Sequence, residues 1–220
     1  HTYNPDIIGI ATTCLSETIG DDISMIVKEY YKRNPGRNKP VILYSSTPSY
    51  RGTHVTGFFK TIHGVVTQTS EHTATIARQI NIFNGLLSPA EIRTIKTTVS
   101  DFLLAPIIFP DYSETLDGGS WNQYYPVPPG GTSLKKLSSC GNSTASIDFS
   151  FCQKDELSAG IYLKEKFDIP CYKTAYPIGI ELCDIFYKTL STLSQSSIPD
   201  KYIQERERLI GAYVDAHKYL

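Results

Sequence analysis

The chain has 220 residues, and its 21 basic and 22 acidic side chains give a formal net charge of -1. With 40% hydrophobic and 20% charged residues, the composition is that of a folded globular protein and excludes a disordered chain. No block of like charge is present to attract nucleic acid or anionic lipid, and no apolar stretch approaches the ~20 residues of a membrane span. No basic segment followed by an apolar run opens the chain. We therefore expect a cytoplasmic protein with neither nucleic acid nor a membrane as its partner.

Short apolar runs recur along the chain, and most of them are apolar on both faces, as parallel strands covered on both sides are. We expect strands over residues 7–11, 41–44, 80–83, 106–109, 145–149 and 169–173. Between these runs, apolar residues recur at spacings of three and four, which predicts amphipathic helices. The helices are expected over residues 19–30, 58–66, 89–102, 157–167, 180–193 and 199–220. This alternation predicts an α/β fold with Rossmann-like parallel sheets flanked by helices.

Two of these helices have features that predict individual contacts. Ser88 and Glu91 have the spacing of a capping box around Pro89, at the start of the third helix. In the last helix, Arg206 and His217 fall close to the apolar side, so we expect Arg206 to pair with a carboxylate and His217 to make one hydrogen bond. We expect this helix to turn the following residues inward: Ile203, Leu209, Ile210, Tyr213 and Val214.

The sharpest change of composition lies in the polar stretch 68–78. We accordingly assign residues 1–73 to the C-terminal part of a first Rossmann-like α/β domain, and residues 74–220 to a second α/β domain with a C-terminal helix. Residues 113–131, which include Trp121, interrupt the alternation and predict a long loop. The chain begins without methionine in a segment that leads into a strand, so we expect an excised piece of a longer polypeptide.

Cys14 is the strongest candidate for chemistry, because it follows the first apolar run at a strand-to-helix turn, where α/β sheets carry their active groups. A nearby helix N-terminus favours the thiolate, which is the form that binds iron and zinc. The alternative is an inert, buried thiol. The five cysteines are scattered without a Cys-x-x-Cys pair, which argues against a disulfide framework or a self-contained zinc site. Any metal bound through Cys14 therefore needs ligands from outside this chain.

Two stretches resemble the signature stretches of the β-type subunits of nitrogenase component 1 and its relatives. They are residues 12–22, TTCLSETIGDD, and residues 46–58, STPSYRGTHVTGF. The resemblance continues in the family's order through residues 109–118, 129–132, 177–180, 205–209 and 215–219. It implies that the chain is a fragment of a multi-domain, nitrogenase component 1-type subunit from a family of nitrogen-fixation oxidoreductases.

The resemblance also implies a metal site. In the family's catalytic β subunit, the cysteine of the first stretch is a ligand of the P-cluster, an iron-sulfur cluster at the α/β interface, and the serine of the second stretch can bind iron when that cluster is oxidised. Carried over by motif, these residues are Cys14 and Ser49, whereas we expect His54 to be a turn or cap side chain. The other β-side cysteines would precede this chain. We therefore expect the isolated fragment to bind no cluster and to be inactive.

Three functions follow as alternatives. Residues 113–118 and 157–160 resemble the N subunit (NifN) of the iron-molybdenum cofactor biosynthesis scaffold, which pairs with the E subunit and holds iron-sulfur clusters during cofactor assembly. This is the leading hypothesis, although some N subunits lack the cysteine at position 14. The second is the β chain (NifK) of a catalytic nitrogenase, with an α-type partner and possible contact with the nitrogenase iron protein. The third is a metal-free α/β domain that binds a small molecule under a lid formed by the loop around Trp121.

Overall fold

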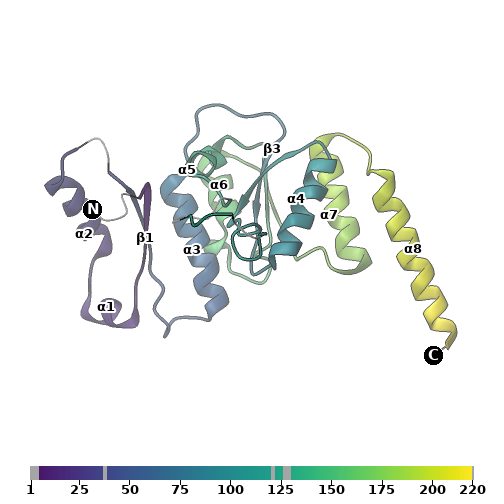
Figure 1. Ribbon diagram of the computed structural model, residues 1–220, viewed down its shortest axis with the longest axis horizontal. Helices are drawn as coiled ribbons and strands as arrows, with labels where there is room; N and C mark the ends of the chain where they lie inside the picture. The colour runs from purple at the N-terminus through teal and green to yellow at the C-terminus, as the bar shows by residue number, and fades with distance from the viewer. Residues whose placement is uncertain (1–4, 37–38, 120–121, 126–129, 220) are drawn as a thin grey trace.

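The computed structural model of the chain (Figure 1) describes residues 5–36, 39–119, 122–125 and 130–219. All strand pairs among these residues are parallel. Strands β1 (Ile7–Ala11) and β2 (Val41–Ser45) form a two-stranded sheet. A four-stranded sheet has the order β4-β3-β5-β6 and consists of β3 (Gln79–Phe83), β4 (Ala105–Phe109), β5 (Ala145–Asp148) and β6 (Cys171–Lys173). The predicted parallel α/β architecture is confirmed.

The helices connect the strands, as parallel pairing requires. They are α1 (Cys14–Ile19), α2 (Ile23–Arg33), α3 (His54–Thr69), α4 (Pro89–Asp101), α5 (Leu134–Ser138), α6 (Ala159–Phe167), α7 (Gly179–Ser194) and α8 (Asp200–Ala216), with short 3-10 helices η1 (Ser139–Asn142), η2 (Asp155–Leu157) and η3 (His217–Tyr219). The predicted capping box begins α4: the Glu91 amide donates to Ser88 Oγ at 3.3 Å, and the Ser88 amide donates to Glu91 Oε2 at 2.6 Å.

The core lies on both faces of the four-stranded sheet. Ile80 and Ile82 of β3 pack on one face with apolar residues of α4 and α7. Phe83, which points the other way, packs with residues of α3 and α6. Every residue of β3 is buried, and the two polar ones, Gln79 and Asn81, donate side-chain hydrogen bonds to the carbonyls of Ser139 and Cys140. Helix α3 also contacts β2 and therefore lies between the two sheets (Figure 1).

The first predicted helix is wrong in its boundaries, because the structure has two helices in that region. Gly20 adopts a left-handed conformation with φ of 82° and ends α1. Asp22 then begins α2, and its side chain accepts a hydrogen bond from the Met25 amide at 2.9 Å. Ile19 belongs to α1 and is 67% exposed. Ile19 and Ile23 are four residues apart, as in a continuous helix, although a turn separates them. The apolar spacing therefore predicted one helix where there are two.

Of the five residues of α8 that were predicted to face inward, only Ile210 is half-buried, and the prediction is wrong for the other four. Ile203 and Leu209 are each 43% exposed, and Tyr213 and Val214 are each 58% exposed. Figure 1 shows α8 at the outer end of the molecule, where its C-terminal half has no neighbouring element. Its apolar spacing is regular, but the described part of the chain offers no surface against which that side of the helix could pack.

Two other predictions for this helix have different outcomes. The pairing of Arg206 with a carboxylate is confirmed, since Nε and Nη2 contact the two oxygens of Asp184 at 2.7 Å each. His217 lies in η3 and is exposed, and no side-chain hydrogen bond from it is present among the described residues.

The polar stretch 68–78, predicted as a domain boundary, begins inside a helix, whereas the predicted long loop is irregular wherever the structure describes it. Helix α3 extends to Thr69, and residues 70–78 then lead to β3 without helix or strand. The division into residues 1–73 and 74–220 stays a prediction. The described parts of the loop, residues 113–119, 122–125 and 130–131, contain no helix or strand, and Trp121 lies outside the described residues. Among the described helices, none combines the length and the hydropathy of a membrane-spanning segment.

Candidate functional site

The carboxyl ends of β1 and β2 lie at the same edge of their sheet, because the strands are parallel and Ala11 pairs with Ser45. Two loops leave this edge, one leading to α1 and the other to α3. Thr12 joins them: its hydroxyl oxygen accepts from the Thr47 amide at 3.0 Å, and its carbonyl accepts from the Thr47 hydroxyl at 3.1 Å. These bonds hold the two loops in one arrangement.

The same arrangement brings together the two site residues that the sequence suggested. Cys14 Sγ and Ser49 Oγ lie 2.7 Å apart, within hydrogen-bond distance, and either group can be the donor. The Ser49 amide also donates to Cys14 Sγ at 3.1 Å. Cys14 is half-buried at the first position of α1, while Ser49 is exposed. The pair is therefore accessible at the surface and is not sealed in the core.

Hydrogen bonds to the sulfur lower the pKa of the Cys14 thiol below its ordinary value. The Ser49 hydroxyl is the largest cause of the lowered pKa and the Ser49 amide is the second; burial acts in the opposite direction, and the Tyr50 amide lowers the pKa by a smaller amount. By contrast, burial raises the pKa of Cys140 and of Cys171 to about 12. The environment of Cys14 thus favours the thiolate, which is the ligand form of cysteine.

We expect this environment to be visible in the alkylation kinetics of the chain. In a Cys152→Ala background, which removes another exposed thiol, the rate of reaction with iodoacetamide should rise with pH around an inflection below that of a free cysteine. Ser49→Ala should move that inflection to higher pH, because it removes the hydroxyl that most favours the thiolate. The modified residue is identified by mass spectrometry. Superimposable pH profiles for the two proteins would contradict the role given to Ser49.

The pair fits part of a metal-cluster site. A thiolate and a hydroxyl are both possible ligands, and both are accessible on one edge of the sheet. The described residues contain no group of three or more His, Cys, Asp or Glu that could hold a metal ion. Since four-iron and larger clusters need more thiolates than one, this pair could contribute only some of the ligands of such a cluster.

The turn that positions Ser49 depends on a glycine. Gly52 has a φ of 84°, and a Cβ atom there would lie 2.9 Å from the Thr56 methyl group, so another side chain would be strained and crowded. Thr53 then caps α3 by accepting from the Thr56 amide at 3.3 Å. His54, predicted as a turn or cap residue, is instead the first residue of the helix.

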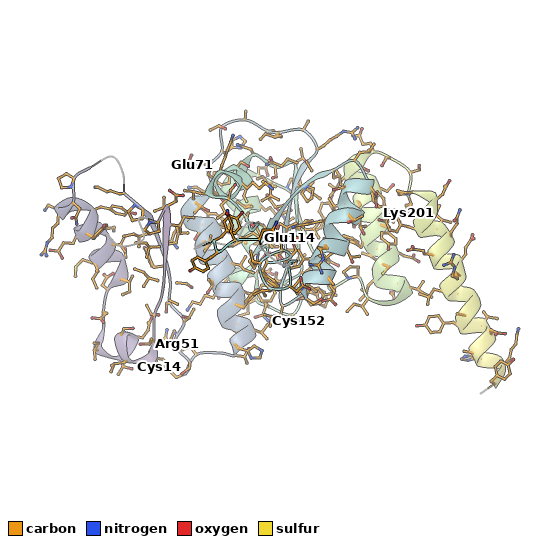
Figure 2. The ribbon with its side chains drawn as sticks, in the orientation of Figure 1. Cys14, Arg51, Glu71, Glu114, Cys152 and Lys201 are labelled. Carbon is orange, nitrogen blue, oxygen red and sulfur yellow. The ribbon has the colours of Figure 1, made fainter. Side chains whose placement is uncertain are left out.

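A cavity of about 580 Å³ adjoins the pair, and Ser49 forms part of its wall. Arg51 and Lys60 also line this cavity. Figure 2 shows Arg51 close to Cys14 at the same end of the molecule. The sequence motifs predict no role for either basic residue. The position of Arg51 two residues after Ser49 was an available signal, whereas Lys60 reaches the site only because α3 folds back along the sheet.

An apolar surface lies next to the pair on α1. Leu15 is 71% exposed and Ile19 is 67% exposed, and Tyr50 in the neighbouring loop is 54% exposed. Large apolar side chains gathered on one short helix and the adjoining loop are typical of a surface that contacts another protein.

Comparisons with known proteins show the family of the chain. A family model described as "Nitrogenase component 1 type Oxidoreductase" matches residues 1–220. The chain is similar to the nitrogenase molybdenum-iron protein beta chain of Clostridium pasteurianum, with 36% identity over 218 residues that cover 99% of this chain and 47% of the relative. It is also similar to the nitrogenase iron-molybdenum cofactor biosynthesis protein NifN of Nostoc sp., with 32% identity over 217 residues that cover 98% and 48%.

The fold shows the same relationship. A chain of the solved structure "Nitrogenase Cp1 at pH 6.5" superimposes with a TM-score of 0.91 at 35% sequence identity, and the match covers 99% of this chain and 47% of that one. The chain thus spans about half the length of the relatives that it matches.

Proposed function

Because the chain belongs to the nitrogenase component 1 type oxidoreductase family, we propose that it is part of a β-type subunit that shares an iron-sulfur cluster with an α-type partner subunit. Cys14 would be a cluster ligand from this chain, and Ser49 would be an additional ligand when the cluster is oxidised. The contact of 2.7 Å between the two side chains supports this proposal most strongly. When bound, such a cluster supplies electron transfer between redox partners.

The local chemistry of the site supports the role of each residue. The hydrogen bonds from Ser49 favour the thiolate form of Cys14, so little free energy is needed to remove its proton before a metal binds. The Ser49 hydroxyl touches the sulfur, so any metal held by Cys14 lies within reach of the hydroxyl oxygen after a small movement. The apolar surface around Leu15 and Ile19 provides an area that a partner subunit can cover.

Within the family, the Cys14–Ser49 contact favours the catalytic β chain, because the resemblance assigns cluster ligation to both residues in that branch. A second candidate is the scaffold for iron-molybdenum cofactor biosynthesis, our leading hypothesis from the sequence. It is favoured by the resemblance of residues 113–118 and 157–160 to the N subunit and by the similarity to NifN. The α-type partner differs between the two branches.

Purification of the full-length subunit together with its α-type partner tests the proposal and separates the branches. The complex is expected to contain iron and acid-labile sulfide. A catalytic β chain should support ATP-dependent reduction of acetylene when the nitrogenase iron protein is added. A scaffold subunit should support no reduction, but should restore activity to a component 1 protein that lacks its cofactor. A complex without iron or sulfide would contradict both branches and favour the metal-free small-molecule-binding domain.

A further inference from the structure

Arg51 and Lys60 bring two positive charges to the cavity beside Ser49. Arg51 is exposed in the loop that follows Ser49, and its guanidinium carbon lies 6.0 Å from the centroid of the Tyr50 ring. Lys60 is half-buried on α3. Neither side chain forms an ion pair within 4.0 Å among the described residues. Both charges are therefore available to act on whatever occupies the space near Cys14.

Glu17 shows that these charges reach the neighbourhood of Cys14. This glutamate lies on α1, one helical turn from the cysteine. Hydrogen bonds from Ser46 and then from Thr12 are the largest causes that lower the pKa of Glu17, and the positive charges of Lys60 and Arg51 lower it further. The basic side chains of α3 and of the loop before it thus act on a group of α1. Glu17, Arg51 and Lys60 together carry one negative and two positive charges, so their net charge beside the cysteine is positive.

This positive net charge affects the reduction potential of a cluster at the site. A cluster ligated by thiolates carries a net negative charge, and each electron that it accepts makes that charge more negative. Nearby fixed cations therefore stabilise the reduced form more than the oxidised form, and the reduction potential rises. A partner that covers Leu15, Ile19 and Tyr50 would exclude water and salt from the site, which strengthens the effect.

We propose that Arg51 and Lys60 raise the reduction potential of the iron-sulfur cluster that Cys14 helps to hold in the assembled subunit pair. This inference rests on the proposed function and adds two residues that tune the cluster without being ligands. Arg51 acts from the loop that carries Ser49, and Lys60 acts from α3 on the other side of the cavity.

The test uses the full-length subunit in complex with its α-type partner. Arg51→Gln and Lys60→Gln each remove one charge, and the midpoint potential is measured by redox titration followed by electron paramagnetic resonance. Each variant is expected to shift the midpoint to more negative values, with a larger shift in the double variant. Arg51→Lys, which keeps the charge, should remain near the unsubstituted complex. Iron per complex, measured in parallel, should be unchanged in all four proteins.

Lys188→Gln is the matched control. Lys188 is exposed on α7, which packs on the face of the four-stranded sheet opposite to α3 (Figure 1), and it forms no ion pair among the described residues. Its removal changes the net charge by the same amount and should leave the potential unchanged.

Three results would overturn the inference. An unchanged potential in the double variant with full iron content would overturn it while leaving the proposed function intact. If Arg51→Gln and Arg51→Lys both lose iron, the role of Arg51 is to hold the site together by packing, and its charge does not set the potential. A complex without iron before any substitution would overturn the inference together with the proposed function.

Discussion

The Cys14→Ala variant of the full-length subunit, purified with its α-type partner, is expected to lose most of the iron of the shared cluster. The reason is that the variant lacks the Cys14 thiolate. Among the described residues, this is the thiolate that lies at the surface next to a second possible ligand, Ser49. Iron and acid-labile sulfide per complex measure the effect directly. The broad absorption of sulfur-to-iron charge transfer should fall in proportion.

The fold should survive this substitution. Cys14 lies on a short helix that contains no buried residue, and its side chain contacts Ser49 at the surface instead of the core. Far-UV circular dichroism of the variant should therefore match that of the unsubstituted complex. Cys152→Ala is the matched control, because Cys152 is a solvent-accessible thiol that forms no side-chain hydrogen bond among the described residues. If both variants keep their iron, Cys14 is not a cluster ligand.

The Phe102→Ala variant of the chain is expected to lose about 3–5 kcal/mol of unfolding free energy, the usual cost of removing a fully buried aromatic side chain. Phe102 follows α4 and is 0% exposed. Its ring stacks on Tyr187 of α7, with centroids 6.2 Å apart, and on Tyr202 of α8, with centroids 5.9 Å apart. Alanine would leave a cavity where three helices meet. This cost is a large share of the ~5–15 kcal/mol that stabilises a typical domain.

Urea unfolding followed by circular dichroism measures this effect as a lower midpoint with an unchanged slope. Phe151→Ala is the control, since Phe151 is 63% exposed and its loss should cost no more than ~0.5 kcal/mol. Equal shifts of the two midpoints would mean that Phe102 does not lie in the core between α4, α7 and α8.

Local sequence patterns predicted most elements of the fold. The strand over residues 7–11 was expected with the bounds that it has in the structure. The start of α4 follows from the Ser88 and Glu91 capping box, which involves residues only three positions apart. The patterns failed where a turn kept the helical spacing of apolar residues, as at Gly20, because periodicity alone does not detect an interruption of the backbone.

The candidate site could be predicted only in part. The apolar run before Cys14 placed this residue at a strand-to-helix turn, and the family resemblance added Ser49. Their contact joins residues 35 positions apart and depends on the parallel register of β1 and β2. Lys60 reaches the cavity beside Ser49 because α3 folds back along the sheet. The number of residues between two positions in the sequence does not tell how far apart their side chains lie in the folded chain.

The amino-acid sequence by itself determined the alternation of strands and helices, the start of α4 and the family of the chain, because these depend on neighbouring residues and on motifs in order. Only the tertiary structure decided that Ser49 hydrogen-bonds to Cys14, that Arg51 and Lys60 flank the pair, and that the apolar side of α8 is exposed. The physical reason is that pairing, burial and the charge around a side chain are set by which elements pack together. Those contacts link segments far apart in the chain.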